Sequence, residues 1–194
     1  MEPSDGVRDL DLEVMVAGGR RLCLRHIRTD DAQALVDMGL RSTPEDLRLR
    51  FFSPVRPMVG PLTSLLTEFD RDRHIAVAVY DPAATEEERG ILGVVRLILG
   101  PGATEGEFAL MVRSDQAGRG LGHCLMEHML GWARARGLTR VRAEIMAENK
   151  RMLRLAREFG AVVQPQNQDF RIVHLAIDLS ALAAPVIDRR LEPI

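Results

Sequence analysis

The sequence predicts a domain of mixed α/β class built on a mostly antiparallel sheet. Three runs of strand-like apolar density, at 75–80, 91–99 and 107–112, follow one another with short polar connections, the pattern of an antiparallel meander. After residue 112 the apolar period changes to that of a helix, a strand, a second helix and a closing strand. A strand, a crossover helix and a further strand are expected to form a parallel pair. We therefore predict a twisted sheet with one parallel pair, flanked by helices.

The segment before the meander is expected to contain one strand and three helices. Residues 1–12 are polar and have no usable period, so we interpret them as a disordered tail. The run 20–28 alternates apolar and polar side chains, as a half-buried strand does. The three helices are expected from Thr29 or Asp30 to about Leu40, from Pro44 toward Phe52, and at 61–69.

The second half is expected to contain two amphipathic helices between strands. Apolar residues from Leu121 to Trp132 lie at helical spacing, and Gly137 is well placed to end that helix. The next helix extends from Met152 to Gly160. The strands around these helices are expected at 107–112, 141–145 and 170–179. We assign one domain to residues 13–180 and a C-terminal extension to 181–194.

Composition excludes several classes of protein. With 194 residues, 46% hydrophobic and 28% charged, the chain matches ordinary globular usage rather than a disordered or fibrous protein. The 26 basic and 28 acidic residues give a net charge of -2, which offers no large cationic field for nucleic acid. No window reaches the roughly 20 apolar residues that a membrane helix needs. We expect no nucleic-acid or membrane partner.

The cysteine and lysine content and the N-terminal residues indicate a cellular location. Cys23 and Cys124 are the only cysteines, too few for a disulfide framework and compatible with a reducing cytosol. The N-terminus is acidic, where a signal peptide would be basic. Lys150 is the only lysine, a bias toward arginine that we associate with GC-rich bacterial genomes. A cytoplasmic bacterial protein is expected.

A glycine-rich loop stands between the third strand of the meander and the first amphipathic helix. Gly118, Gly120 and Gly122 alternate there, and residues without a Cβ let successive backbone N–H groups approach an anion. The helix dipole adds about half a positive charge at the same place. A pyrophosphate would fit this loop. The alternative is a tight turn whose glycines serve backbone conformation alone, and the loop matches neither a Walker motif nor a Rossmann fingerprint.

This loop, placed after a meander and before a helix, a strand and a helix headed by Asn149, resembles the GNAT N-acetyltransferases over roughly residues 20–180. Within that superfamily the chain is most similar to the bacterial Pat-type protein lysine acetyltransferases. The segments that carry this likeness are 50–56, 68–73, 107–109, 112–115 and 148–153. The resemblance implies a GNAT-like fold, with the parallel strand pair at the cofactor site. It also implies acetyl-CoA as cosubstrate, no metal, and a protein lysine as acceptor, with an acyl-CoA synthetase as the expected partner.

The resemblance places the catalytic glutamate at Glu107. A lysine amine with a pKa of about 10.4 is almost entirely protonated at neutral pH, so a base must remove its proton before attack. Glu107 is expected to share a face with Ala109 and Met111 and to take the proton directly or through water. From spacing alone, the alternative is a solvated carboxylate on an edge strand.

The resemblance also implies which residues hold acetyl-CoA. Strand backbone at 110–112 is expected to bind the acetyl and pantetheine groups as an added strand would. The loop is expected to bind the pyrophosphate, with Arg119 reaching a phosphate oxygen, and Asn149 to contact the pantetheine arm. The expected cofactor-binding residues are Leu110, Met111, Val112, Ala117, Gly118, Arg119, Gly120, Leu121, Gly122, Asn149 and Met152.

Two departures from the superfamily pattern stand out. Members often have Arg or Gln where Ala117 falls, and Gln116 lies one position early. Many also have a tyrosine that protonates the departing thiolate, but the matching position is Ala156 and the only tyrosine is Tyr80. The Pat-type relatives tend to lack that tyrosine too, and a thiol of ordinary pKa near 8.5 leaves with solvent protonation. The general acid is therefore unassigned.

Other readings of the same residues stay open. Cys124 and His128 lie four apart with Glu127 nearby and could begin a zinc site, but no further ligand cluster follows, so packing roles are favoured. The scaffold also suits a small-molecule amine acetyltransferase. A third possibility is a non-catalytic CoA-binding sensor, which Ala117 and Ala156 keep open. The sequence does not set the oligomeric state.

Overall fold

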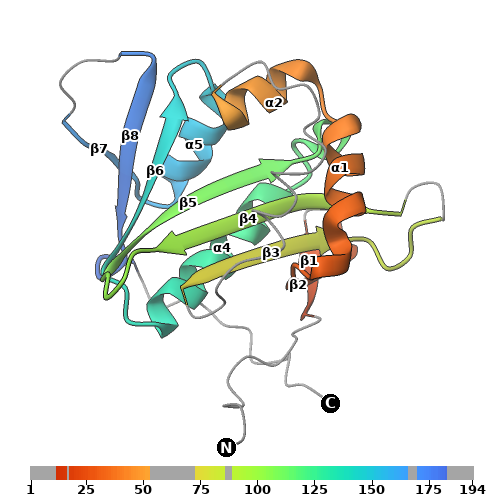
Figure 1. The fold of residues 1–194 in the computed structure, drawn as a ribbon, viewed down its shortest axis with the longest axis horizontal. Coiled ribbons are helices and arrows are strands. Elements are labelled where there is room, and N and C mark those ends of the chain that lie inside the picture. The colour runs from red at the N-terminus through yellow and green to blue at the C-terminus, as the bar shows by residue number, and fades with distance from the viewer. Residues whose placement is uncertain (1–11, 17, 53–72, 86–88, 166–169, 183–194) are drawn as a thin grey trace, which may run out of the picture.

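A computed structural model describes residues 12–16, 18–52, 73–85, 89–165 and 170–182. Its strands form one sheet in the order β1-β2-β3-β4-β5-β6-β8-β7 (Figure 1). The strands are β1 Leu12–Val16, β2 Arg20–His26, β3 His74–Tyr80, β4 Ile91–Leu99, β5 Glu105–Val112, β6 Arg140–Met146, β7 Val162–Val163 and β8 Ile172–Asp178. The helices are η1 Thr29–Asp31, α1 Ala32–Leu40, α2 Pro44–Phe51, η2 Ser114–Gln116, α4 Leu121–Ala135 and α5 Lys150–Glu158.

The predicted fold class is confirmed. Every strand pair in the described sheet is antiparallel except β5 with β6, the pair on either side of the crossover helix α4. The helix ends were also placed correctly, because Gly137 and Gly160 take left-handed φ values of +74° and +78° just after α4 and α5. The helix expected at 61–69 lies outside the described residues.

Two strands were not predicted. The polar tail was expected to reach residue 12, but β1 begins at Leu12, and Val14 and Val16 are more buried than Glu13 and Met15. Gly18 and Gly19 follow β1, both with positive φ, and join it to β2 in a hairpin. The second missed strand, β7, is only two residues long. The strand expected from 107 also begins earlier, at Glu105.

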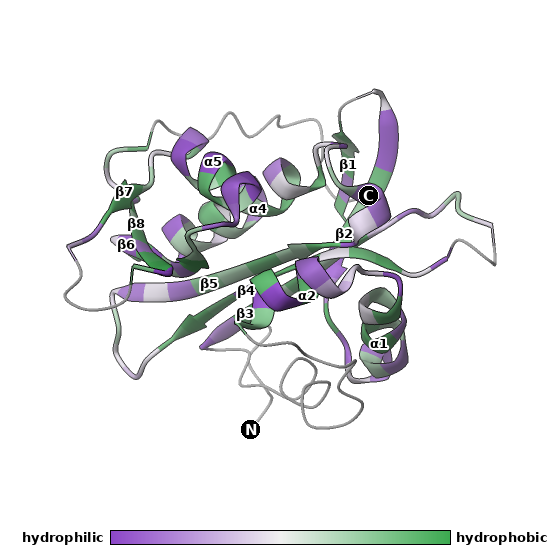
Figure 2. Ribbon diagram, turned by 90° about the horizontal axis from the view of Figure 1, so that it is seen from above, coloured by the Kyte–Doolittle hydropathy of each residue, from purple (hydrophilic) through white to green (hydrophobic). Residues whose placement is uncertain are grey.

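Helices cover both faces of the sheet. Viewed from above, α4 and α5 lie on one face and α1 and α2 on the other (Figure 2). The larger hydrophobic core is on the α4 side and includes Phe108, which is 3% exposed. A smaller cluster lies on the α1 side, and Met111 packs against it. Side chains of β5 therefore alternate between the two cores. None of the helices in the described ranges is long and apolar enough to cross a membrane.

The sheet opens between β5 and β6. These strands pair only over residues 105–107 with 140–142, whereas β4 accompanies β5 to Val112 and β8 accompanies β6 to Met146. The two strands therefore separate toward their carboxyl ends. In open α/β sheets that is the end at which ligands bind.

A substitution at Gly106 measures how tightly the sheet is packed where β5 and β6 still pair. A Cβ at this position would lie 2.7 Å from Cδ1 of Leu97 and 3.3 Å from the carbonyl oxygen of Ile98. We expect Gly106→Ala to lower the free energy of unfolding by about 1–3 kcal/mol, the usual cost of overpacking. Gly39→Ala in α1 is the matched control, since its added Cβ would meet no atom within 4 Å apart from its chain neighbours and the backbone of its own helix, and it should be neutral or stabilising by up to about 1 kcal/mol. Urea unfolding of both variants checks this, and equal stability of the two would contradict it.

The buried Arg25–Asp31 pair should make stability depend on acid pH. Asp31 is 5% exposed and accepts two 2.6 Å bonds from the Arg25 guanidinium and one of 2.8 Å from the Arg28 N–H. Burial alone would raise the pKa of Asp31, but these bonds outweigh it and lower the pKa below 3.8. The pair's contribution is thus full above about pH 4 and disappears as pH falls through the lower, folded-state pKa.

We expect Asp31→Asn to lower the free energy of unfolding by about 3 kcal/mol at pH 7. Because the wild type loses the same contribution in acid, the difference between the two proteins should shrink below about pH 4. Urea titrations at pH 7, 5 and 3 measure this. A difference that stays constant across the series would show that the ionised carboxylate contributes nothing.

Candidate active site

A groove of about 1720 Å³ includes the gap where β5 and β6 separate and extends along α4 to β1 and β2. At the gap its walls come from β5, the glycine loop, the first turn of α4, the end of β6, the start of α5 and α2. A pocket for a drug-sized ligand is typically about 300–1,000 Å³. This groove therefore has room for an extended ligand and a second reactant.

Most of the residues predicted to form the site come together in this groove. Those that line it are Glu107, Leu110, Met111, Val112, Ala117, Gly118, Gly120, Leu121, Gly122, Asn149 and Met152. Arg119 is exposed and is not part of the lining.

The glycine loop presents backbone N–H groups to the groove. Gly118 and Gly120 take φ values of +76° and +84°, and Gly120 is the N-cap of α4 without a side-chain cap bond. The first helical bond runs from Cys124 N to the Gly120 oxygen at 3.1 Å, so the N–H groups of residues 121–123 precede the hydrogen-bond ladder. Such N–H groups, with the helix dipole behind them, favour an anion.

The third glycine has a packing role. A Cβ on Gly122 would lie 3.0 Å from Cδ2 of Leu155 in α5. Its absence lets α4 and α5 approach closely beside the loop. The three glycines therefore serve two requirements, backbone conformation at Gly118 and Gly120 and close helix packing at Gly122.

Buried polar side chains fix the turn that leads into the loop. Arg113 is 4% exposed and donates to both carboxylate oxygens of Asp115, at 2.7 and 2.9 Å. These bonds hold the pKa of Asp115 below its usual value. Gln116 donates to Asp115 at 3.0 Å and accepts from Arg20 of β2 at 2.8 Å. The side chain of Gln116 thus anchors the loop to the sheet.

Glu107 lies on the face of β5 that carries Ala109 and Met111, as expected, and its side chain is exposed. It shares the groove with Arg50 from α2, and the β4–β5 register places Arg96 opposite Ala109 on the same face. Burial, with the like charge of Arg96, lowers the pKa of Arg50 to about 10, while the charge of Glu107 opposes this. The Glu107 carboxylate therefore lies close enough to Arg50 to affect it, on the sheet face that also carries Arg96.

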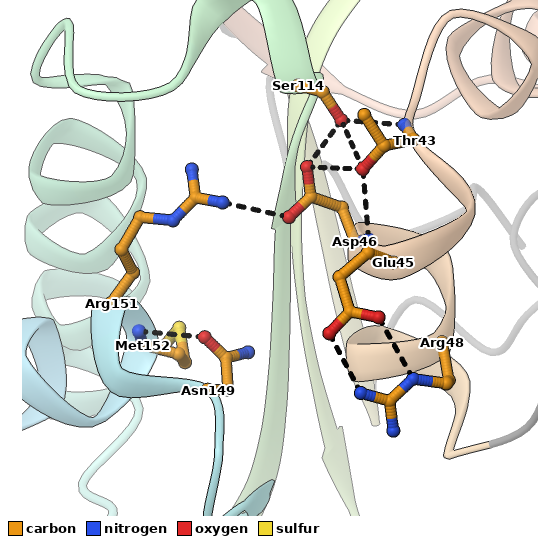
Figure 3. A network of polar contacts seen from close by, with 8 residues as sticks. All are labelled: Thr43, Glu45, Asp46, Arg48, Ser114, Asn149, Arg151 and Met152. Atoms are coloured by element: carbon orange, nitrogen blue, oxygen red, sulfur yellow. Dashed lines mark hydrogen bonds and ion pairs between the residues drawn. The ribbon is translucent and has the colours of Figure 1, made fainter.

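The start of α5 forms the wall opposite β5. The side-chain oxygen of Asn149 accepts from Met152 N at 3.1 Å and so caps the helix (Figure 3). Ala156, where many superfamily members are expected to have a tyrosine, is fully buried on the core side of α5. Tyr80 is not part of the groove lining either.

Cys124 and His128 both line the groove on α4. Burial, with a smaller effect of Glu127, raises the pKa of the Cys124 thiol to about 11. Burial, with a smaller effect of His26, lowers the pKa of His128 to about 4. Both groups are neutral near pH 7. Within the described ranges, no three His, Cys, Asp or Glu side chains gather in a way that could hold a metal ion.

Sequence reasoning missed a polar network at the mouth of the groove. Asp46 of α2 contacts Ser114 beside the loop and Arg151 in α5, across 68 and 105 residues of sequence (Figure 3). Ser114 and Arg151 were quoted as parts of family-like segments, but Asp46 was not singled out. No local pattern marks partners that are so far apart along the chain.

Comparison with known proteins agrees with this architecture. The GNAT domain of S. lividans PAT is 27% identical over 86% of this chain and 96% of its own, with a TM-score of 0.75. A mutant of the cAMP-binding acyltransferase from Mycobacterium smegmatis is 26% identical, with a TM-score of 0.60; the match covers 93% of this chain but only 50% of that one. The spermidine N-acetyltransferase from Vibrio cholerae, solved with CoA and spermine, shares the fold at 18% identity and a TM-score of 0.65, over 82% of this chain and 96% of its own.

The sequence model of the acetyltransferase (GNAT) domain matches residues 21–162, well over half of the chain. That range contains both strands of the split, the glycine loop and the start of α5. The chain therefore belongs to the GNAT acetyltransferase domain family and is an acyltransferase.

Proposed function

We propose that this protein transfers the acetyl group of acetyl-CoA to a lysine side chain of a protein, and that an acyl-CoA synthetase is the acceptor. The observation that carries the proposal is the carboxylate of Glu107 in a groove that opens between the two parallel strands. The similarity to the GNAT domain of S. lividans PAT supports the choice of acceptor class. A cytoplasmic bacterial setting, inferred from cysteine and arginine usage, is part of the same proposal.

The groove suits the chemical groups of acetyl-CoA. The N–H groups at the start of α4 face the position proposed for the pyrophosphate, and β5 from Leu110 to Val112 lies beyond its pairing with β6, where strand backbone can bind the pantetheine amides. Asn149 and Met152 form the wall opposite that arm. The bound cosubstrate supplies an activated thioester.

In this proposal Glu107 acts as the general base. Deprotonating a lysine amine at neutral pH costs about 4–5 kcal/mol, and a carboxylate at the attacking nitrogen removes the proton as the bond forms. Its exposure within the groove lets an incoming side chain reach it. Since Ala156 is buried and Tyr80 lies outside the groove, solvent is proposed to protonate the departing thiolate.

We expect Glu107→Gln to reduce kcat/KM for acetyl transfer about 100-fold or more at pH 7, because a general base contributes roughly that factor. The dissociation constant of acetyl-CoA should stay the same, since the role of this side chain is toward the amine. The measurement is transfer of labelled acetyl to purified acetyl-CoA synthetase, with wild type and variant side by side. A variant as active as the wild type would remove the base assignment.

The same assay with spermidine and other free amines tests the acceptor. Rapid acetylation of a small amine without label on the synthetase would replace the protein acceptor by a small molecule and leave the chemistry intact. Binding of acetyl-CoA without transfer to any amine would instead favour the interpretation as a non-catalytic CoA-binding sensor.

A further inference from the structure

The hydrogen bonds of the sheet hold the two walls of the groove together at one end only. Past Glu107 and Arg142 the register joins β5 to β4 and β6 to β8, but not β5 to β6. The glycine loop continues from the β5 side and α5 from the β6 side. A ligand that contacts both walls needs them at a fixed separation, so contacts outside the sheet must set the width of the open end.

Asp46 makes such contacts to both walls. Its Oδ2 accepts from Ser114 Oγ at 2.5 Å and from Thr43 Oγ1 at 3.0 Å, and its Oδ1 accepts from an Arg151 nitrogen at 3.0 Å (Figure 3). Ser114 lies on the β5 side, four residues before Gly118, and Arg151 is in the first turn of α5. One carboxylate therefore contacts both Ser114, beside the glycine loop, and Arg151, in the helix on the opposite wall.

The surrounding contacts fix Asp46 in place. Thr43 caps α2 by accepting from Asp46 N at 3.1 Å, and Thr43 N donates to Ser114 Oγ at 2.8 Å. The Asp46 side chain is 19% exposed, whereas that of Arg151 is 68% exposed. The bond to Ser114 is therefore the more sheltered arm, and the Arg151 arm lies at the surface, where ion pairs are weaker.

The neighbouring acid on the same helix is arranged differently. Glu45 accepts two hydrogen bonds from Arg48 of its own helix, a bidentate ion pair at 2.8 and 3.1 Å. The Glu45 side chain is 60% exposed. Arg48 in turn reaches Glu148 at 2.6 Å, on the β6 side alone. Glu45 thus has the charge and the helix of Asp46 without a contact to the loop side, which makes it a matched control.

We propose that Asp46 is a positioning residue whose carboxylate holds the loop side of the groove, at Ser114, and the α5 side, at Arg151, at the separation that one CoA molecule spans. This inference rests on the proposed placement of acetyl-CoA in the groove. It assigns Asp46 no part in proton transfer. Asp46 should affect the affinity of ligands that contact both walls. The affinity of a ligand that contacts the loop alone should not depend on Asp46.

The test compares CoA with its nucleotide half, 3′-phosphoadenosine 5′-diphosphate, which carries the pyrophosphate but no pantetheine. Calorimetry on the full chain gives both dissociation constants for wild type, Asp46→Ala, Ser114→Ala, the double variant and Glu45→Ala. We expect Asp46→Ala and Ser114→Ala each to weaken CoA binding about tenfold, the scale of a charge-assisted hydrogen bond. The dissociation constant of the nucleotide should stay within about twofold of the wild-type value in every variant. The double variant should lose no more CoA affinity than the single variant with the larger loss.

Several results would overturn the proposal. Equal losses for CoA and the nucleotide would mean that the loop itself is damaged. A loss in Asp46→Ala that Ser114→Ala does not reproduce would mean that Asp46 acts on the cofactor directly. An equal loss in Glu45→Ala would mean that any charge removed from α2 has the same effect. A wild-type chain that binds neither CoA nor the nucleotide would instead remove the proposed function.

Discussion

The structure depends on a parallel strand pairing that stops after three residues. Because β5 and β6 share hydrogen bonds only at 105–107 and 140–142, each strand keeps its other neighbour and the sheet opens without losing its outer pairs. Buried Gly106 lies within that short stretch, where Leu97 and the Ile98 carbonyl leave no room for a side chain. The split is thus a built-in property of the sheet, and the glycine loop, α5 and α2 are arranged around it.

Two kinds of anchor keep the groove in shape. Apolar contacts fix the helices, since α4 packs over the main core and Gly122 allows α5 to come close. Charged and polar contacts fix the loop and the mouth, through Arg113 with Asp115 and through Asp46 with its neighbours. Apolar packing sets the position of an element only broadly, whereas hydrogen bonds also set its orientation.

Much of the fold could be predicted from the sequence, because its strong signals are local. The meander, the change of period after residue 112 and the glycines after α4 and α5 each lie within a short window, and the structure confirms them. The hairpin of β1 was missed although the pair Gly18–Gly19 between two alternating runs marks it. The glycine loop was found because three close glycines are visible in sequence. The partners of Asp46 were not, because contacts over 68 and 105 residues leave no periodic trace.

The alternation of side chains along β5 has a consequence for how reactants meet. Phe108, Leu110 and Val112 pack with the core beneath α4, whereas Glu107 and Met111 face the side of α1 and α2. A thioester held in the slot between the strands, as proposed, would therefore be open to an amine from the opposite face of the sheet. Acetyl-CoA and the amine would approach from opposite faces of the sheet, so both could be bound at the same time. In that arrangement the acetyl group would pass directly to the amine within a ternary complex, without the protonated thiol of Cys124 as an acyl carrier.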